Sequence, residues 1–216
     1  MRFTHNILLI FLIALSTGAC TPLNIADEGI FKNNKDLKKL IAKGENVNFQ
    51  DRDGTTALIN AATYGNLESA KLLIEAGANV NLRNNNGETA IGNIAFSSES
   101  TDGEMLDLLI SKGANINDKN NYGETSIYYA IAYGYQDLVQ ILISRGASLS
   151  TKDNAGQTPI WSVCESNTKN KEILDTLLAN GANINSRDND NDTISALISC
   201  QNKPLFMAYM KSKGLK

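Results

Sequence analysis

Histidine is almost absent from this chain. Its 216 residues include only one, His5, close to the amino terminus. Ser-His-Asp and Cys-His catalysis need an imidazole as the general base, and many zinc sites need one as a ligand. If the first residues are removed on maturation, no histidine is left for such a site. The sequence therefore gives no support for these catalytic classes or for a histidine-containing zinc site.

Cysteine is scarce as well, and none of Cys20, Cys164 and Cys200 has the CxxC spacing of a structural zinc or thioredoxin-like redox site. Cys164 and Cys200 fall at nearly equivalent positions of two consecutive repeats, described below. Stacked helices lie about 10 Å apart, whereas a disulfide needs alpha carbons within about 7 Å. We therefore expect small buried thiols, with a disulfide as the alternative if the one-position offset shortens the gap.

Basic residues are not in excess, since 20 Lys and Arg stand against 23 Asp and Glu, for a formal net charge of −3. Nucleic-acid affinity comes largely from basic side chains that neutralise phosphates. Glycine-rich phosphate loops are missing too, because each glycine is solitary. The acidic run from Asp188 to Asp192 lacks the glycine and distant glutamate of an EF-hand loop. We therefore expect no nucleic-acid partner, no cofactor and no metal.

The amino terminus lacks an apolar run long enough to cross a membrane. Nine apolar residues, Ile7 to Leu15, would rise about 14 Å as a helix, against a bilayer core of about 30 Å. Arg2, this run and the small residues after it have the three-part layout of a secretory signal. The ending Gly18-Ala19-Cys20 resembles the lipobox of bacterial lipoproteins. That resemblance implies cleavage before Cys20 and lipidation of its sulfur.

One departure leaves alternatives open, because Thr17 stands where that family usually has an aliphatic residue. The alternatives are a plain signal cleaved after Ala19 and an uncleaved anchor. The expected organisation is a signal peptide over 1–19, a short tether over 20–23 and a repeat domain over 24–216. The expected location is the outer membrane of the bacterial cell envelope, with the chain lipid-anchored through Cys20 and facing the periplasm. Secretion is the alternative.

Polar turns with nearly the same residues recur along the chain. "GANVNLRNNNGETAI" begins at Gly77, and similar stretches begin at Gly113, Gly146 and Gly181. The threonines of these turns, Thr56, Thr89, Thr125, Thr158 and Thr193, are separated by 33, 36, 33 and 35 residues. The glycines Gly44, Gly77, Gly113, Gly146 and Gly181 keep the same spacing. A period near 33 predicts a stacked solenoid.

Each period is typical of a helix pair. In residues 51–83, Thr56 can cap a short helix through "ALINAATYG", and Gly65 can end it. The apolar residues Leu67, Ala70, Leu73 and Ile74 then follow at spacings of three and four, which indicates a second, amphipathic helix. One such pair cannot cover its own apolar face, so it needs neighbours on both sides.

These turns resemble the ankyrin-repeat family. The resemblance rests on "GTTAL" from Gly54, on "GETAI", "GETSI" and "GQTPI", and on the repeated "GAN[VI]N". Only Thr158-Pro159-Ile160 keeps the proline of the family's TPL signature, and its usual histidine is replaced by Ile59, Gly92, Tyr128 and Trp161. The resemblance implies an all-α solenoid of stacked helix-turn-helix units with short β-hairpin tips. That histidine position packs inward in the family, so we expect Tyr128 and Trp161 in the core.

The expected units are 24–50, 51–83, 84–119, 120–152, 153–187 and 188–216. The first keeps only its second helix clearly, and the last is degenerate, with Asn191 in the glycine position of the turn. The additional residues of the units 84–119 and 153–187 fall between the two helices of each unit.

The family resemblance also implies a binding surface, a concave groove formed by the hairpin tips and the exposed face of the first helices. The matching candidates for partner binding are Tyr64, Phe96, Tyr122, Tyr129, Tyr133, Arg52, Asp53, Glu88 and Glu124. Exposed aromatic residues grouped on one face are typical of a binding hot spot. Alternatively, some of these rings pack between neighbouring units. The same spacing also places Asn60, Asn93, Ser97 and Ser166 on the exposed side.

We therefore expect a monomeric, non-enzymatic module that binds another protein. An inhibitor or immunity protein of an envelope enzyme or toxin would combine export with this fold. A secreted effector that acts on host proteins is the alternative, and an enzyme with a site in the insertions between helices is a further one. Solenoid folds serve many unrelated targets, so the partner cannot be named from the fold.

Overall fold

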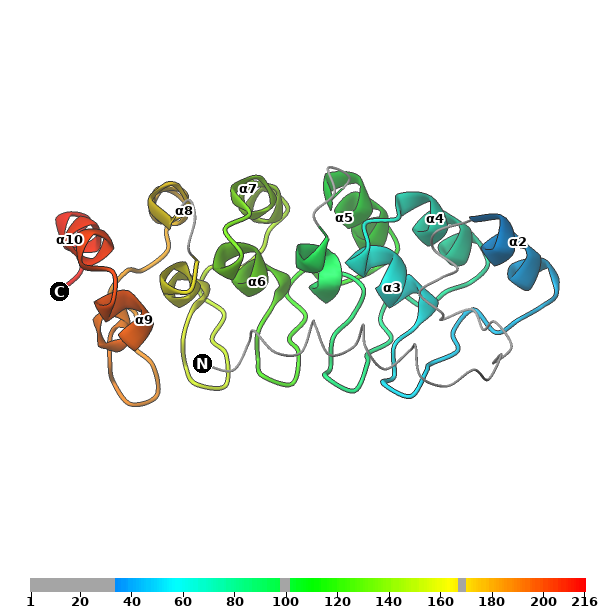
Figure 1. Cartoon of the computed structure of the whole chain (residues 1–216), viewed down its shortest axis with the longest axis horizontal. Coiled ribbons are helices and arrows are strands. Elements are labelled where there is room, and N and C mark those ends of the chain that lie inside the picture. The colour runs from blue at the N-terminus through cyan, green and yellow to red at the C-terminus, as the bar shows by residue number, and fades with distance from the viewer. Residues whose placement is uncertain (1–33, 98–101, 167–169) are drawn as a thin grey trace, which may run out of the picture.

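The computed structural model of this chain describes residues 34–97, 102–166 and 170–216. Short helices stack side by side in two layers into an elongated solenoid, with long loops projecting from one edge (Figure 1). Within the described residues there is no strand, and isolated β-bridges join Gln50 to Thr56 and Arg187 to Thr193. The all-α solenoid predicted from the sequence is therefore confirmed, with single bridges at two hairpin tips.

The first helix of each pair is short. These helices are α3 (Ala57–Thr63), η2 (Gly92–Phe96), α6 (Ser126–Ala132), η3 (Pro159–Cys164), and η4 (Ile194–Ala196) followed by α9 (Ile198–Gln201). The predicted cap is present at α3, where the Thr56 side chain accepts a hydrogen bond from the Ile59 N–H at 3.2 Å. Gly92 is a poor helix residue, and η2, which begins with it, is a 3-10 turn, as is η3.

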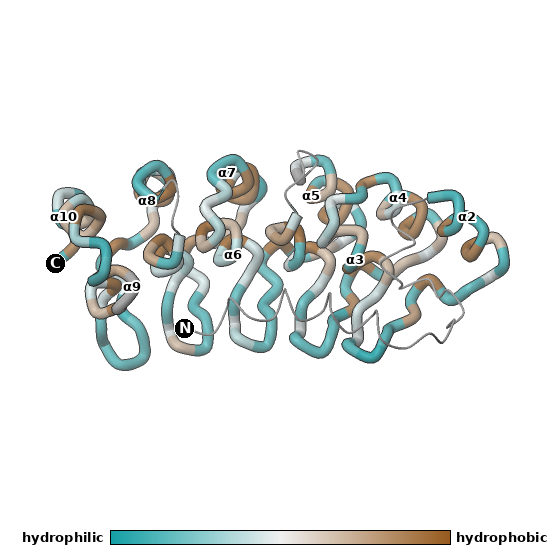
Figure 2. The backbone as a smooth tube through the Cα atoms, in the orientation of Figure 1, coloured by the Kyte–Doolittle hydropathy of each residue, from teal (hydrophilic) through white to brown (hydrophobic). Residues whose placement is uncertain are grey.

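The second helices form the other layer. They are α2 (Asn34–Ala42), α4 (Leu67–Glu75), α5 (Asp102–Ser111), α7 (Gln136–Ser144), α8 (Asn170–Ala179) and α10 (Pro204–Ser212). Hydrophobic residues gather where the two layers meet, and the loops are hydrophilic (Figure 2). Within the described residues, no helix has the length and apolar character needed to cross a bilayer.

The core lies between these layers and continues from one helix pair to the next. Leu73, Leu106 and Leu142 of the second helices are fully buried. Tyr128 and Trp161 are also buried, as their inward position predicted. The Trp161 indole N–H donates to the Ser186 hydroxyl at 2.9 Å, so a polar group of the neighbouring loop satisfies the buried ring.

Each hairpin loop is folded by a side chain at its start. In the loop that precedes α6, the Asn120 Oδ1 accepts hydrogen bonds from the backbone N–H groups of Tyr122 and Glu124. Asp51, Asn84, Asp153 and Asp188 make the same pair of bonds in their own loops. These are Asx turns, for which Asp and Asn are favoured. The acidic run that begins at Asp188 is therefore a hairpin loop of this kind.

Asparagine side chains link each loop to the one before it. The Asn121 amide donates to the Asn85 carbonyl at 2.9 Å, and the Asn154 amide donates to the Asn121 carbonyl at 2.8 Å. The backbone N–H of Asn154 also donates to the Tyr122 carbonyl at 2.9 Å. Asn85 and Asn189 make the equivalent side-chain bonds. We call Asn85, Asn121, Asn154 and Asn189 the asparagine ladder, and it explains why the polar turn is repeated.

The glycine of each loop is required by the same contacts. Gly123 has a φ of +82°, in the left-handed region that other residues rarely adopt. A Cβ there would also lie 2.7 Å from the backbone nitrogen of Asn154, so a side chain would separate the two loops. In the last unit Asn191 takes this position with a φ of +67°, which matches its predicted place in the glycine position.

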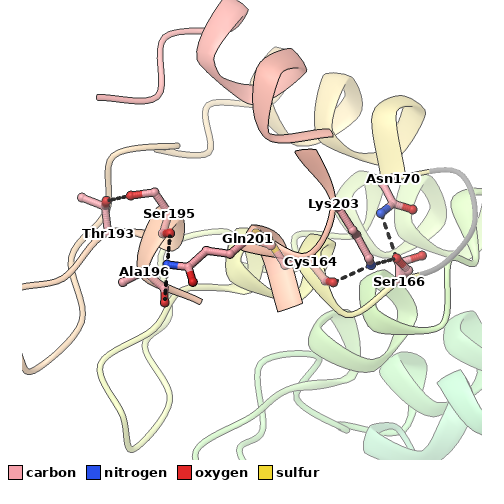
Figure 3. Close-up of a disulfide and its surroundings, with 9 residues drawn as sticks. Cys164, Ser166, Asn170, Thr193, Ser195, Ala196, Gln201 and Lys203 are labelled. Atoms are coloured by element: carbon pink, nitrogen blue, oxygen red, sulfur yellow. Dashed lines mark hydrogen bonds between the residues drawn. A yellow bond between two sulfur atoms is a disulfide. The ribbon is translucent and has the colours of Figure 1, made fainter. Parts of the chain in front are cut away.

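Cys164 and Cys200 form a disulfide, with alpha carbons 4.8 Å apart. The expectation of free buried thiols is therefore wrong. The 10 Å spacing of packed α-helices does not apply here, because η3 and α9 are short turns and the two cysteines are offset by one position. Beside the disulfide, the Lys203 ammonium donates to the carbonyls of Cys164 and Ser166 at 2.6 and 2.5 Å (Figure 3). These bonds and the disulfide join the last unit to the stack.

Candidate binding face on the first helices

The first helices and the hairpin loops before them share one surface, which we call the first-helix face. Three of the predicted binding residues are exposed on it, with 47% of Tyr64, 59% of Tyr122 and 41% of Tyr133 accessible to solvent. Phe96 and Tyr129 are half-buried. Arg52 and Asp53 are exposed at a loop tip, whereas Glu88 and Glu124 are half-buried beside their loops.

Four aromatic rings are in contact on this face and at its edge, and we call Phe96, Tyr129, Tyr133 and Tyr135 the aromatic cluster. Ring centroids lie 5.0 Å apart for Phe96 and Tyr129, and 5.8 Å apart for Phe96 and Tyr133. Tyr133 is 6.5 Å from Tyr129 and 5.8 Å from Tyr135. The structure thus joins three of the five predicted aromatic residues across two units.

The sequence analysis missed Tyr135 and misplaced four polar residues. Tyr135 precedes α7 and lies outside the first helices. The only feature of the sequence that could have indicated its contact with the cluster is its position two residues after Tyr133. Asn60, Asn93, Ser97 and Ser166 were expected to be exposed, but all four are buried. That expectation is wrong because consecutive first helices pack directly against one another. In addition, η2 and η3 have three residues per turn, which rotates the positions that follow them.

Glu124 organises the polar side of the aromatic cluster. The Tyr129 hydroxyl donates to the Glu124 Oε2 at 2.7 Å, and the Asn120 amide donates to the same oxygen at 3.1 Å. The Asn120 amide also donates to the Tyr129 hydroxyl oxygen at 2.7 Å. One unit earlier, Glu88 accepts from the Asn84 amide at 2.7 Å. Both carboxylates are thus held in place by neutral donors.

The carboxylates of this face shift the pKa values of their neighbours. Burial first, and then the hydrogen bond to Glu124, raises the pKa of the Tyr129 hydroxyl. Burial, then Tyr135 and Glu124, raises the pKa of Tyr133. The pKa of the Glu165 carboxyl is raised by desolvation and next by the charge of Glu124. These tyrosines therefore stay protonated at neutral pH, and the surface around them is negative.

The arrangement is suited to binding. The tyrosine hydroxyls, with their raised pKa values, are poor nucleophiles and poor general bases at neutral pH. Among residues 34–97, 102–166 and 170–216, no three His, Cys, Asp or Glu side chains lie close enough to hold a metal ion. What the face offers is a set of packed, partly exposed rings with carboxylates at their edge.

Comparison with known proteins gives one family. A family model described as ankyrin repeats (3 copies) matches residues 23–120 and 93–188. No curated protein matches the sequence. The two matched ranges include the candidate residues of the first-helix face and most of the asparagine ladder.

Proposed function

Since the chain belongs to the ankyrin-repeat family, we propose that it is a non-enzymatic module that binds a partner protein through its first-helix face. Ankyrin repeats typically serve as non-enzymatic scaffolds for protein–protein interaction. The observation that carries the proposal is the aromatic cluster. Its rings are packed together from two units, yet 41% of Tyr133 faces solvent.

Such a cluster has the character of a binding hot spot. Tyrosine is enriched among the residues that dominate binding energy, because a rigid ring contributes a large contact area at low entropic cost. Mutual packing also fixes the orientation of the Tyr133 ring before a partner arrives. Preorganisation of this kind strengthens binding because less conformational freedom is lost.

We further propose that the module is exported and held in the bacterial cell envelope by lipid on Cys20. That residue lies outside the described residues, so the proposal rests on the lipobox-like ending Gly18-Ala19-Cys20. The disulfide between Cys164 and Cys200 supports export, because disulfides persist in oxidising compartments and are rare in the cytosol. An inhibitor or immunity protein of an envelope enzyme or toxin fits this location, and a secreted effector is the alternative.

Partner capture tests the binding face. Wild-type chain on a resin should capture a protein from its source cells, and the double variant Tyr129→Ala with Tyr133→Ala should lose it. Tyr209→Ala on α10 is the matched control, because it removes a half-buried ring from the opposite layer. The single variant Tyr133→Ala keeps the hydrogen bond between Tyr129 and Glu124. A loss of capture by this variant therefore cannot be caused by disruption of that bond. If both ring variants retain every captured protein, the proposed face is wrong.

A further inference from the structure

The surroundings of Tyr209 show which groups a tyrosine–carboxylate pair gathers in this chain. The Tyr209 hydroxyl donates to the Asp175 Oδ2 at 2.6 Å. The Lys213 ammonium lies 2.6 Å from the Asp175 Oδ1 and 5.0 Å from the centre of the Tyr209 ring. Lys171 lies 5.2 Å from the same ring centre. A cation thus contacts both the carboxylate and the ring face, which attracts it through its quadrupole.

The first-helix face repeats this pair without its cation. The Tyr129 hydroxyl donates to the Glu124 Oε2 at 2.7 Å, much as Tyr209 donates to Asp175. Yet within the described part of the chain no Lys or Arg lies over a ring of the aromatic cluster. Nor does Glu88, Glu124 or Glu165 form a salt bridge with any described residue. Among the described residues, the rings and carboxylates are thus assembled with no cation over the rings and no salt bridge to the carboxylates.

Several basic side chains of the loops are engaged elsewhere, whereas Arg52 is exposed at the tip of its own loop. The Lys119 ammonium donates to the Lys152 carbonyl at 2.7 Å, and the Lys152 ammonium donates to the Arg187 carbonyl at 2.9 Å. Arg83 is paired with Asp118 at 3.3 Å. Lys203, whose charge is felt by Glu165, donates to the carbonyls of Cys164 and Ser166. A partner is therefore already present for the cations of Arg83, Lys119, Lys152 and Lys203.

The three carboxylates also lie on three consecutive units. Glu88 precedes η2, Glu124 precedes α6, and Glu165 follows η3. They act on a common region, since all three charges raise the pKa of Tyr133. A single free cation would neutralise one of these charges, whereas a segment of chain with several basic residues could reach all of them. The length of the acidic edge thus favours a polypeptide.

On the basis of the function proposed above, we infer that the partner presents a basic segment to this face. One arginine or lysine of that segment lies on the Tyr133 ring, with its charged head between Glu124 and Glu165. Its methylene stem packs on the aromatic cluster, since long basic side chains bury their stems and keep their heads polar. Arginine suits the site best, because a guanidinium stacks on rings and pairs with carboxylates through a planar fork.

Fluorescence anisotropy with a labelled peptide tests this inference. The probe is a short Gly-Ser-Arg repeat, and its control has Gln in place of every Arg. We expect the purified full chain to bind the Arg peptide and to leave the Gln peptide free. Glu124→Gln with Glu165→Gln should weaken binding about tenfold, because each exposed ion pair contributes a few-fold. Glu124→Gln keeps an oxygen that can accept the Tyr129 hydroxyl, so the fold is preserved.

The matched control is Glu68→Gln with Glu75→Gln. Both residues are exposed on α4, and the double variant changes the net charge by the same amount. This variant should bind the Arg peptide with an affinity within about twofold of wild type, since remote exposed charges are screened by salt. Equal weakening by both pairs, or equal binding of both peptides, would overturn the inference. Spermine binding as tightly as the Arg peptide would overturn the assignment to a protein segment.

The peptide assay and the partner-capture assay test the basic segment and the binding face independently. If the Arg peptide does not bind but the Tyr129 and Tyr133 variants still lose the captured protein, the basic segment is wrong and the binding face stands. If the Arg peptide binds but those variants retain every captured protein, the proposed function is wrong.

Discussion

At the scale of single residues, the polar side chains have two roles, since some stabilise the loops and others supply charge to the first-helix face. Those of the loops bond inside the solenoid, as Asn120 does in its turn and Asn121 does across to the preceding loop. Glu124 differs, because its carboxylate is held by neutral donors and its charge acts on the aromatic cluster. The repeated Asn and Asp residues of the loops are therefore structural, whereas Glu124 and its repeat equivalent Glu88 supply negative charge to the face.

The effect of the Glu124 charge on its neighbours predicts a change in the pKa of Glu165. Removing the Glu124 charge with Glu124→Gln should lower the pKa of Glu165, since a like charge nearby disfavours ionisation. Burial remains, so the pKa should stay above its ordinary value. Titration of carbon-labelled glutamate side chains by NMR measures it directly. Glu68→Gln on α4 is the control and should leave the Glu165 pKa where it is.

The same shift has a consequence for stability. Because the pKa of Glu165 is raised in the folded chain, its contribution to stability is present in acid, below the unfolded pKa. That contribution is lost as pH rises through the folded pKa. Glu124→Gln should therefore lose less stability than wild type between acid and neutral pH. A larger loss in the variant would contradict the proposed effect of Glu124 on Glu165.

At the scale of elements, the contacts between loops order the stack. Short first helices such as η2 and η3 have few turns of their own, and isolated helices of this length are unstable in water. They are held by packing on both sides and by loops that bond to their neighbours, as Asn154 bonds to Tyr122 and Asn121. The spacing between units is thus set partly by backbone contacts at Gly123.

Two glycine-to-alanine substitutions distinguish the two reasons why a loop needs glycine, which are a positive φ and the close approach of the neighbouring loop. Gly113 and Gly123 both have positive φ values, so an alanine at either costs about 1–2 kcal/mol in backbone strain. A Cβ at Gly113 meets nothing within 4 Å, whereas one at Gly123 meets Asn154 at 2.7 Å. Gly123→Ala should therefore cost about 1–3 kcal/mol more, from crowding. Guanidinium denaturation measures both, and equal losses would show that the loops do not restrain one another.

At the scale of the whole molecule, the solenoid is a scaffold closed at its carboxyl end by a disulfide. Residues 188–216 depart from the repeat, and Cys200 ties them to the unit that contains Cys164. Lys203 bonds at the same junction (Figure 3). The aromatic cluster lies in the middle of the stack, on units with neighbours on both sides. The candidate binding face therefore lies on units that are packed on both sides.

Much of this architecture could be predicted from the sequence, because helix pairs and their period depend on local patterns. The burial of Tyr128 and Trp161 and the turn at Asn191 followed from their positions in the repeat. The disulfide was expected only as the alternative to free thiols, and the burial of Asn60 was not predicted. Both depend on how closely one unit approaches the next, which the spacing of residues along one helix does not determine.

The candidate face was predictable in its members but not in its arrangement. Phe96, Tyr129 and Tyr133 were identified by repeat position, yet their contacts with one another depend on the register between η2 and α6. The missing cation could be seen only after the partners of the other basic side chains were known. Charges that are balanced elsewhere in the fold cannot be recognised from composition alone.

Hydroxyl-radical footprinting of the chain with its captured partner tests the central claim most directly, because it reports the exposure of single tyrosine rings. Tyr133 on the first-helix face and Tyr209 on α10 serve as probe and internal control. The account predicts that the partner strongly reduces oxidation of Tyr133 and leaves that of Tyr209 unchanged. The account would be contradicted if the partner reduced oxidation of Tyr209 while Tyr133 was oxidised as fast as in the chain without its partner.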